Sequence, residues 1–270
     1  MIPKRPNFFY HLHPPTLPAR ESSFTYTFGL GGISIFLALV LLATGILLTF
    51  VYVPTPAEAF PSIEILTYQT AFGWLVRNLH YWAAQLMVIC VALHMLRVLF
   101  TGAYQAPRRT NYVIGLVLLA LIVLFDFTGY VLRWDAGTSW ALTVGTSLLK
   151  EVPLIGSAVY QIIVGGSDIS ATTTIRFYAW HVVGLTLIVL ILIAWHAFKV
   201  RRDGGISHQA REPRVDRAQL VTLETKAMLI VSAILILISI VLPAPIGPFA
   251  DLPIRSGSVQ APWFFLWIQF

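Results

Sequence analysis

The sequence has little charge and almost no cysteine. Only 11% of its 270 residues are charged, whereas soluble domains carry about 25%. The single cysteine, Cys90, excludes an intrachain disulfide and any metal site built from several cysteines. In place of charge the chain is 57% hydrophobic, which is typical of a protein that crosses a membrane several times.

The excess of positive charge does not indicate a nucleic-acid partner. A net charge of +6 arises from 18 Lys and Arg against 12 Asp and Glu, but the basic residues lie between apolar stretches. Residues 1–28 are polar and rich in proline and aromatic side chains, without the apolar centre that a cleavable signal peptide needs. We therefore expect an N-terminal segment at the membrane interface over residues 1–28.

Five apolar stretches are long enough to span a bilayer. They cover residues 33–53, 79–100, 112–132, 177–198 and 227–242. At about 1.5 Å per residue, helices of this length cover most or all of a hydrocarbon core of about 30 Å. Backbone groups in lipid must be paired within their own segment, so each span is expected to be helical. Pro153 and Gly156 interrupt a further apolar piece at 148–164, which we interpret as interfacial helices.

The distribution of basic residues predicts the orientation of the chain. With a cytoplasmic N-terminus, 13 of the 18 Lys and Arg lie on the cytoplasmic side and the remainder on the outer side, as the positive-inside rule expects. A sixth span at 148–164 would reverse the later spans and remove this asymmetry. We therefore expect a multi-pass protein of a bacterial inner membrane.

Four of the seven histidines lie in two of the apolar spans. One such histidine could simply hydrogen-bond a neighbouring helix, although an ionisable side chain at membrane depth usually marks function. His80 and His94 are 14 residues apart, and His181 and His196 are 15 apart. These intervals differ from whole helical turns by about 40° and about 60°, so each pair shares one face and is separated by about 21–22 Å.

Two helices of this kind can hold two metal centres at different depths. In the predicted orientation His80 meets His181 near the outer side, and His94 meets His196 near the inner side. Zinc takes three or four protein ligands, whereas a haem iron needs only two opposed side chains. The histidines therefore predict an all-α membrane protein in which a four-helix bundle holds two haems, with a fifth transmembrane helix.

Glycines on the first and third spans repeat the histidine interval. Gly31 and Gly45 are 14 residues apart, as are Gly115 and Gly129. Glycine permits a bulky group to approach a helix closely, although small residues also serve helix–helix packing in membranes. The matched interval on two helices favours slots for the haem rings.

Three arginines lie close to the histidines in the sequence. Arg77 precedes His80, Arg97 follows His94 and Arg176 precedes His181, each by three to five residues. An arginine can pair with the anionic propionates of a haem. The alternative is an interfacial arginine whose aliphatic stem lies along apolar surface.

Short motifs over residues 24–270 resemble the cytochrome b family of bc1 and b6f complexes. They are Gly-Leu-Gly-Gly at 29–32, Gly-Tyr-Val-Leu at 129–132, Val-Pro-Leu-Ile-Gly at 152–156 and Thr-Ile-Arg-Phe-Tyr at 174–178. The 15-residue histidine interval and the run Arg-Arg-Asp-Gly-Gly-Ile-Ser at 201–207 are similar to the b6 type.

This resemblance implies a dihaem subunit of a quinol–cytochrome c reductase, or of an enzyme with a plastocyanin-like acceptor. Electrons from quinol oxidised at the outer side would pass through two non-covalent haems b to a quinone at the inner side, where Arg201 matches a b6 residue. Implied partners are a Rieske iron–sulfur protein, a c-type cytochrome, membrane lipid and a second copy in a homodimeric complex. The alternative is a dihaem membrane anchor that links a dehydrogenase to the quinone pool.

The sequence departs from the family at three places. Gly29 replaces the cysteine that attaches an extra haem in chloroplast b6, so no attached haem is expected. Ala-Pro-Trp-Phe at 261–264 replaces the Pro-Glu-Trp-Tyr of the outer quinol pocket, which removes its glutamate and leaves Asp251 as a candidate. The residues still expected to line this pocket are Pro262, Trp263 and Phe264. The chain ends at Phe270, where a further helix would begin, so a small membrane subunit is expected to supply the remaining helices.

These expectations divide the chain into three parts. Residues 1–28 form the interfacial segment, and residues 29–210 form the dihaem four-helix core. Residues 211–270 contain the fifth helix and the outer quinol-pocket segment.

Overall fold

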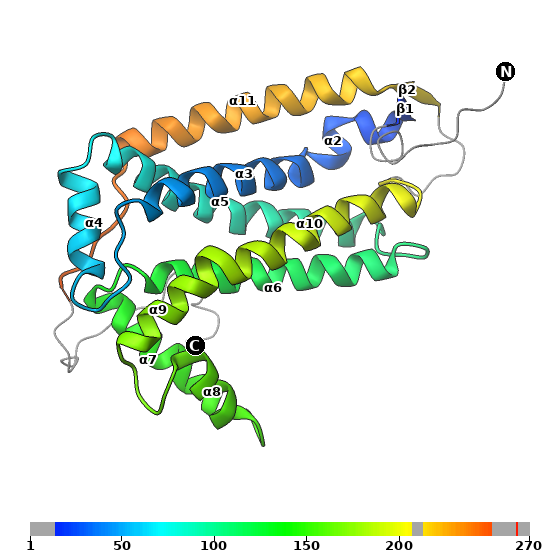
Figure 1. Cartoon of the computed structure of the whole chain (residues 1–270). Helices are drawn as coiled ribbons and strands as arrows, with labels where there is room; N and C mark the ends of the chain where they lie inside the picture. The colour runs from blue at the N-terminus through cyan, green and yellow to red at the C-terminus, as the bar shows by residue number, and fades with distance from the viewer. Residues whose placement is uncertain (1–13, 207–212, 250–262, 264–270) are drawn as a thin grey trace. The chain divides into compact units, whose positions relative to one another are not determined.

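A computed structural model describes residues 14–206, 213–249 and Trp263, and most of these residues are helical (Figure 1). Five helical segments of this described part are long and apolar enough to cross a membrane. They are α3 (Leu30–Thr49), α5 (Gly73–Phe100), α6 (Arg109–Val131), the continuous run α9 (Ala171–Ala179), η2 (Trp180–Gly184) and α10 (Leu185–Arg202), and α11 (Arg217–Val241). Each contains or overlaps one predicted span, and the all-α membrane fold is confirmed.

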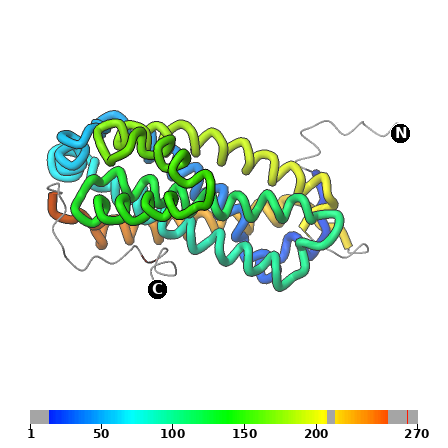
Figure 2. Tube along the Cα trace, turned by 90° about the horizontal axis from the view of Figure 1, so that it is seen from below, coloured from blue at the N-terminus to red at the C-terminus, as the bar shows by residue number. Residues whose placement is uncertain are grey.

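Shorter elements connect the spans. They are β1 (Thr16–Pro18), η1 (Ala19–Ser22), α2 (Phe24–Thr27), α4 (Ala59–Tyr68), α7 (Ala136–Lys150), α8 (Gly156–Val164) and β2 (Arg214–Asp216). The apolar piece 148–164 forms the end of α7, a turn through Pro153 and the whole of α8, and it is not among the five helices long enough to span a membrane. Figure 2 shows α7 and α8 packed side by side. A Cβ on Gly156 would lie 2.5 Å from the Leu149 carbonyl oxygen, so this turn requires glycine.

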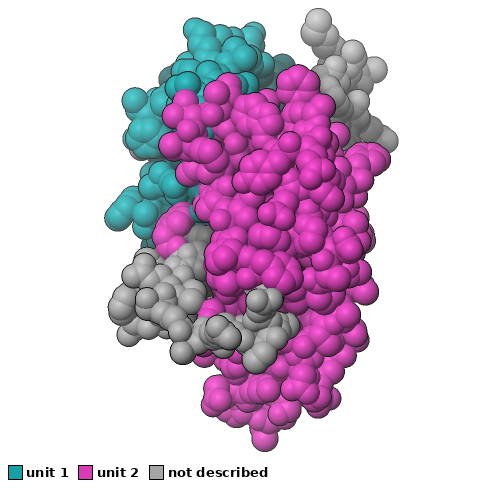
Figure 3. All heavy atoms as spheres, turned by 90° about the vertical axis from the view of Figure 1, so that its left-hand side faces the viewer, with its two compact units in different colours: residues 1–40, 83–121, 188–238 teal, residues 41–82, 122–187, 239–270 magenta. Residues whose placement is uncertain are grey.

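The chain folds as two compact units, coloured teal and magenta in Figure 3. Unit 1 comprises residues 1–40, 83–121 and 188–238, and unit 2 comprises residues 41–82, 122–187 and 239–270. The long helices contribute residues to both units. The two units are therefore interleaved along the sequence, and each is described separately below.

In unit 1 the N-terminal segment is joined to the residues that precede α11. The strands β1 and β2 pair antiparallel, with Thr16 opposite Asp216. The backbone N–H of Arg217 donates to the Pro15 carbonyl at 3.0 Å, and the N–H of Ala19 donates to Pro213 at 2.8 Å. This pairing places η1, with the buried carboxylate of Glu21, beside the chain that leaves α10.

In unit 2 the segment that follows α11 is held by the first turns of α5. Arg77 donates to the carbonyls of Ala244 and Pro245 at 3.0 and 2.8 Å. The Asn78 side chain accepts from Ala244 N at 2.9 Å and donates to the Ser239 carbonyl at 2.8 Å. Because Arg77 and Asn78 are buried, these bonds satisfy polar groups that water cannot reach.

Asp135 joins the same segment to α7. Its side chain is fully buried, caps α7 by accepting from Thr138 N at 2.9 Å, and accepts from Gly247 N at 2.9 Å. Arg133 balances its charge at 3.2 Å. An apolar cluster surrounds this junction in unit 2, formed by Ala59, Val131, Trp134, Leu142 and Phe177.

We predict that Asp135→Ala lowers the free energy of unfolding by about 2–4 kcal/mol, because it removes a helix cap and leaves buried donors without an acceptor. Thermal unfolding of the detergent-solubilised protein, followed by circular dichroism, measures the change. Asp168→Ala is the matched control, since Asp168 is exposed and accepts from the adjacent Ser167. Equal effects of the two substitutions would contradict the prediction.

Candidate haem sites

One pair of histidines lies within unit 2. His80 is on α5 and His181 is in η2, and their ring centroids are 6.4 Å apart with an interplanar angle of 68°. Two opposed imidazoles that bind one metal ion through bonds of about 2 Å place their centroids roughly 6 Å apart. The spacing of His80 and His181 therefore fits a single metal ion between the two rings.

Each ring of this pair lies against a glycine of a neighbouring helix. A Cβ on Gly45 would lie 3.3 Å from His80 Cε1, and a Cβ on Gly129 would lie 2.7 Å from His181 Cε1. Real Cβ contacts are not as short as the second distance, so a side chain at Gly129 would displace the ring. Glycine is needed here for the close approach of a ring rather than for an unusual backbone angle.

The second pair lies within unit 1. A Cβ on Gly31 would lie 3.3 Å from His94 Cε1, and a Cβ on Gly115 would lie 3.4 Å from His196 Cε1. His94 and His196 are close enough to interact electrostatically. The four predicted glycines thus face the four predicted histidines one to one, and each unit holds one pair.

The donor set fits a metal that brings ligands of its own. In the described part of the chain, no group of three or more His, Cys, Asp or Glu side chains could hold a metal ion. A zinc site would need such a group. Two imidazoles suffice for a haem iron, because the porphyrin supplies four nitrogens.

The structure explains why one histidine interval is a residue longer than the other. Residues 180–184 form a π-helical turn around His181, in which Leu185 N bonds to the Trp180 carbonyl. A π turn spans five residues where an α-turn spans four, so the 15 residues to His196 rotate the helix about as far as 14 in a regular helix. Thr186 Oγ1 also donates to the His181 carbonyl at 2.9 Å, which helps to satisfy the altered backbone.

The Trp180 ring leaves no space for a side chain at position 184, within this turn. A Cβ on Gly184 would lie 2.4 Å from the Trp180 ring. The residues that make the turn possible are therefore Gly184 and Thr186, neither of which the sequence pattern indicated.

The predicted propionate partners differ in their surroundings. Arg77 already donates to two backbone carbonyls of unit 2, and Arg176 donates to the Ile162 carbonyl. Arg97 donates through Nε to the Tyr26 carbonyl at 3.0 Å and lies over the Tyr26 ring. Its NH2 atom is buried and has no hydrogen-bond partner among the described residues, so Arg97 retains a donor for an anion.

At one end of unit 1, Arg201 is paired with a carboxylate that sequence reasoning missed. Glu21 is only 1% exposed and accepts from Arg201 at 2.9 Å and from Ile206 N at 2.8 Å. The two ion-paired side chains are 180 residues apart, so no local signal could have identified Glu21. Close by, burial raises the pKa of Asp203, but Arg202 and Lys199 outweigh it and the net direction is downward.

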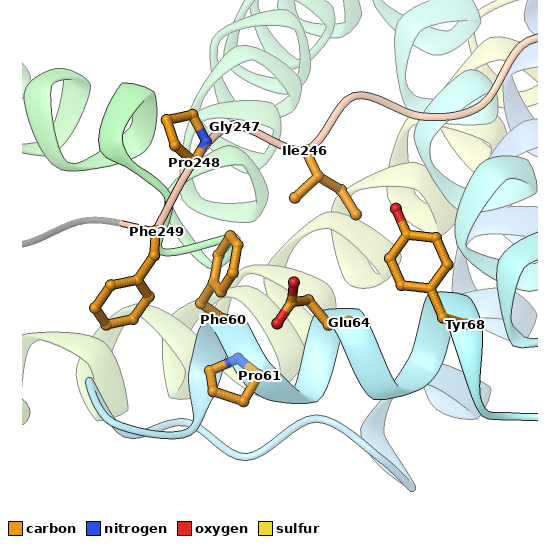
Figure 4. A pocket seen from close by; sticks show the side chains of 8 residues that line it. All are labelled: Phe60, Pro61, Glu64, Tyr68, Ile246, Gly247, Pro248 and Phe249. Atoms are coloured by element: carbon orange, nitrogen blue, oxygen red, sulfur yellow. The ribbon is translucent and has the colours of Figure 1, made fainter.

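Unit 2 also contains a surface pocket of about 560 Å³, shown in Figure 4. Its lining residues are Phe60, Pro61, Glu64 and Tyr68 of α4 with Ile246, Gly247, Pro248 and Phe249. Glu64 is the one carboxylate of this lining, and Phe60 and Phe249 make an edge-to-face contact at 5.5 Å. Of the predicted quinol-pocket residues, Trp263 is half-exposed, while Pro262, Phe264 and Asp251 lie outside the described residues.

Comparison with known proteins identifies the family of the chain. The family model described as Cytochrome b/b6/petB matches residues 17–204. The cytochrome b6 of Synechococcus elongatus is 37% identical over 175 residues, covering 65% of this chain and 81% of that protein. The cytochrome b6 of Cyanidium caldarium is 39% identical over 174 residues, covering 64% and 81%.

A solved structure shares the fold. A chain of a hyperthermophilic respiratory Complex III superposes with a TM-score of 0.78 at 24% identity, covering 90% of this chain and 68% of that one. Fold and histidine pairs together define a membrane-spanning b-type cytochrome. The chain belongs to the cytochrome b/b6 family, whose members bind haem b as subunits of bc1- and b6f-type oxidoreductase complexes.

We predict that Gly129→Ala destabilises the protein by about 1–3 kcal/mol through overpacking and lowers its haem b content. The pyridine haemochrome spectrum of the purified protein measures the haem. Gly166→Ala is the control, since a Cβ there would meet nothing within 4 Å. Wild-type haem content and melting temperature in Gly129→Ala would show that the contact with His181 is unimportant.

We also predict that Glu21→Gln destabilises the protein by about 2–3 kcal/mol, because it leaves the Arg201 charge without its buried partner. The melting temperature in detergent reports the loss. Glu151→Gln, at an exposed position, is expected to have no effect. If both variants have the melting temperature of the wild type, the Glu21–Arg201 pair does not stabilise the fold.

Proposed function

We propose that the chain is the dihaem cytochrome b subunit of a bc1/b6f-type quinol oxidoreductase, in which residues 29–210 form the dihaem core. The observation that carries this proposal is the pairing of histidines, with one pair and its two glycines in each unit. His80 and His181 would hold the outer haem, and His94 and His196 would hold the inner haem. A bound haem supplies a reversible one-electron carrier.

The protein's own contribution is to position these carriers and to keep them apart from water. The four glycines let the imidazole rings of the histidines lie against the neighbouring helices, and the buried NH2 of Arg97 would be a donor for the inner propionates. Arg77 and Arg176 are proposed to serve the outer haem while they keep their backbone bonds. Arg201 and its neighbours would lie at the inner quinone.

Movement of electrons across the bilayer is what would make this arrangement useful. Quinol would be oxidised at the outer side, beside Pro262, Trp263 and Phe264, and a quinone would be reduced at the inner side. An electron that crosses the membrane against its potential stores about 2.3 kcal/mol per 100 mV. We place the N-terminus in the cytoplasm of a bacterium, because 13 of 18 Lys and Arg then lie inside.

The proposed partners follow from the class of enzyme. They are a Rieske iron–sulfur protein, a c-type cytochrome or similar acceptor, a small membrane subunit, lipid and a second copy of the complex. Proteins that co-purify with the chain test this assembly. A molybdenum or nickel subunit in place of the Rieske protein would instead favour a membrane anchor of a dehydrogenase.

We predict two haems b per chain in the purified protein and one haem in the His94→Leu variant, because leucine cannot ligate the inner iron. The pyridine haemochrome assay counts them. Met95→Leu is the control, since it changes the adjacent residue without removing a ligand. One haem or none in the wild type would refute the dihaem assignment.

A further inference from the structure

The residue before each histidine-facing glycine differs between the two units. In unit 2 these residues are Thr44, before Gly45, and Thr128, before Gly129. In unit 1 the residues before Gly31 and Gly115 are Leu30 and Ile114. The two candidate haem sites therefore share their glycine pattern but differ in one adjacent side chain on each helix.

Both threonines hydrogen-bond the histidine that faces their glycine. Thr44 Oγ1 lies 2.9 Å from His80 Nδ1, and Thr128 Oγ1 lies 3.0 Å from His181 Nδ1. The two threonines are buried, at 8% and 5% exposure, so water does not compete for these bonds. The arrangement thus occurs twice, on two different helices, around the same pair of rings.

The direction of each bond follows from a second contact of the hydroxyl. Thr44 Oγ1 donates to the Leu41 carbonyl at 3.3 Å, and Thr128 Oγ1 donates to the Phe125 carbonyl at 2.9 Å. A hydroxyl has one proton, and a carbonyl can only accept. The histidine Nδ1 is therefore the protonated atom and donates to the threonine, which leaves Nε2 free to ligate a haem iron.

The residues before the glycines offer the histidines of unit 1 no such hydroxyl. Leucine and isoleucine carry no polar side-chain atom at positions 30 and 114. His196 Nδ1 is buried and lies near the Asn111 carbonyl. The Leu41 and Phe125 carbonyls lie in the same way beside His80 and His181, so the threonine hydroxyls are what distinguishes unit 2. The two pairs of histidines therefore differ in the hydroxyl that unit 2 adds beside each ring.

We propose that Thr44 and Thr128 are positioning residues that lower the reduction potential of the outer haem. This inference rests on the proposed function. An acceptor on Nδ1–H orients the ring and makes Nε2 more basic. In a bound haem, a more basic histidine nitrogen would favour the oxidised iron, so one-electron reduction would become less favourable. Positions 30 and 114 carry no hydroxyl, so the inner haem would lack this threonine contribution.

The test is a redox titration of the visible haem absorbance in the purified protein. Thr44→Val and Thr128→Val keep a β-branched side chain and remove the acceptor, so the potential of the outer haem is expected to rise while that of the inner haem stays constant. Thr44→Ser keeps the hydroxyl, so the potential of the outer haem is expected to stay at the wild-type value in this variant. The His94→Leu variant, with the outer haem alone, assigns the two components.

A matched control exists on the same helix. Thr49 Oγ1 donates to the Ile46 carbonyl at 2.7 Å, which is the same kind of backbone contact without a histidine. Thr49→Val is therefore expected to leave both potentials unchanged. The proposal would be overturned if Thr49→Val shifted the outer potential as much as Thr44→Val does. It would also be overturned if Thr44→Ser shifted that potential as much as Thr44→Val does.

A substitution that adds a hydroxyl beside the inner haem tests the proposal even if the valine variants lose the outer haem. Ile114→Thr supplies a hydroxyl at the position before Gly115 and is expected to lower the potential of the inner haem. An unchanged inner potential in a protein that retains both haems would count against the proposal. A wild-type protein with fewer than two haems would instead refute the proposed function itself.

Discussion

The close approach of an imidazole ring to a turn of helix without a side chain is the constraint on which both candidate sites depend. At Gly129 even a methyl group would lie 2.7 Å from the ring of His181, and at Gly45 it would lie 3.3 Å from His80. Such contacts are possible only if the helices are held in a fixed register. The rest of the structure can be understood as a set of buried bonds that hold this register.

In unit 2 those bonds begin one turn before the first histidine. Arg77 and Asn78 fasten the chain that follows α11, and Asp135 fastens it again from the start of α7. The residues that shape the surface pocket beside Glu64 are therefore connected to the helix that carries His80. Arg77 and Asn78, which hold this segment, lie within one turn of His80 on the same helix.

In unit 1 a buried ion pair has a corresponding role, beside the pairing of β1 with β2. Glu21 and Arg201 join the N-terminal segment to the end of α10, the helix that carries His196. The resemblance to b6 assigned Arg201 to a quinone pocket, and the structure adds a structural partner for it. The two roles are compatible, since Glu21 contacts NH1 and the guanidinium has further donors.

The sequence alone determined the five spans, the spacing of the histidines and the matching spacing of the glycines. These features can be read from the sequence because all of them follow the α-helical period of about 3.6 residues. Only the tertiary structure identified Glu21 as the partner of Arg201, Thr44 and Thr128 as hydrogen-bond acceptors, and the π turn around His181. These features join residues far apart in the chain or depart from the regular helical period. They depend on which side chains meet after folding, and no local pattern encodes that.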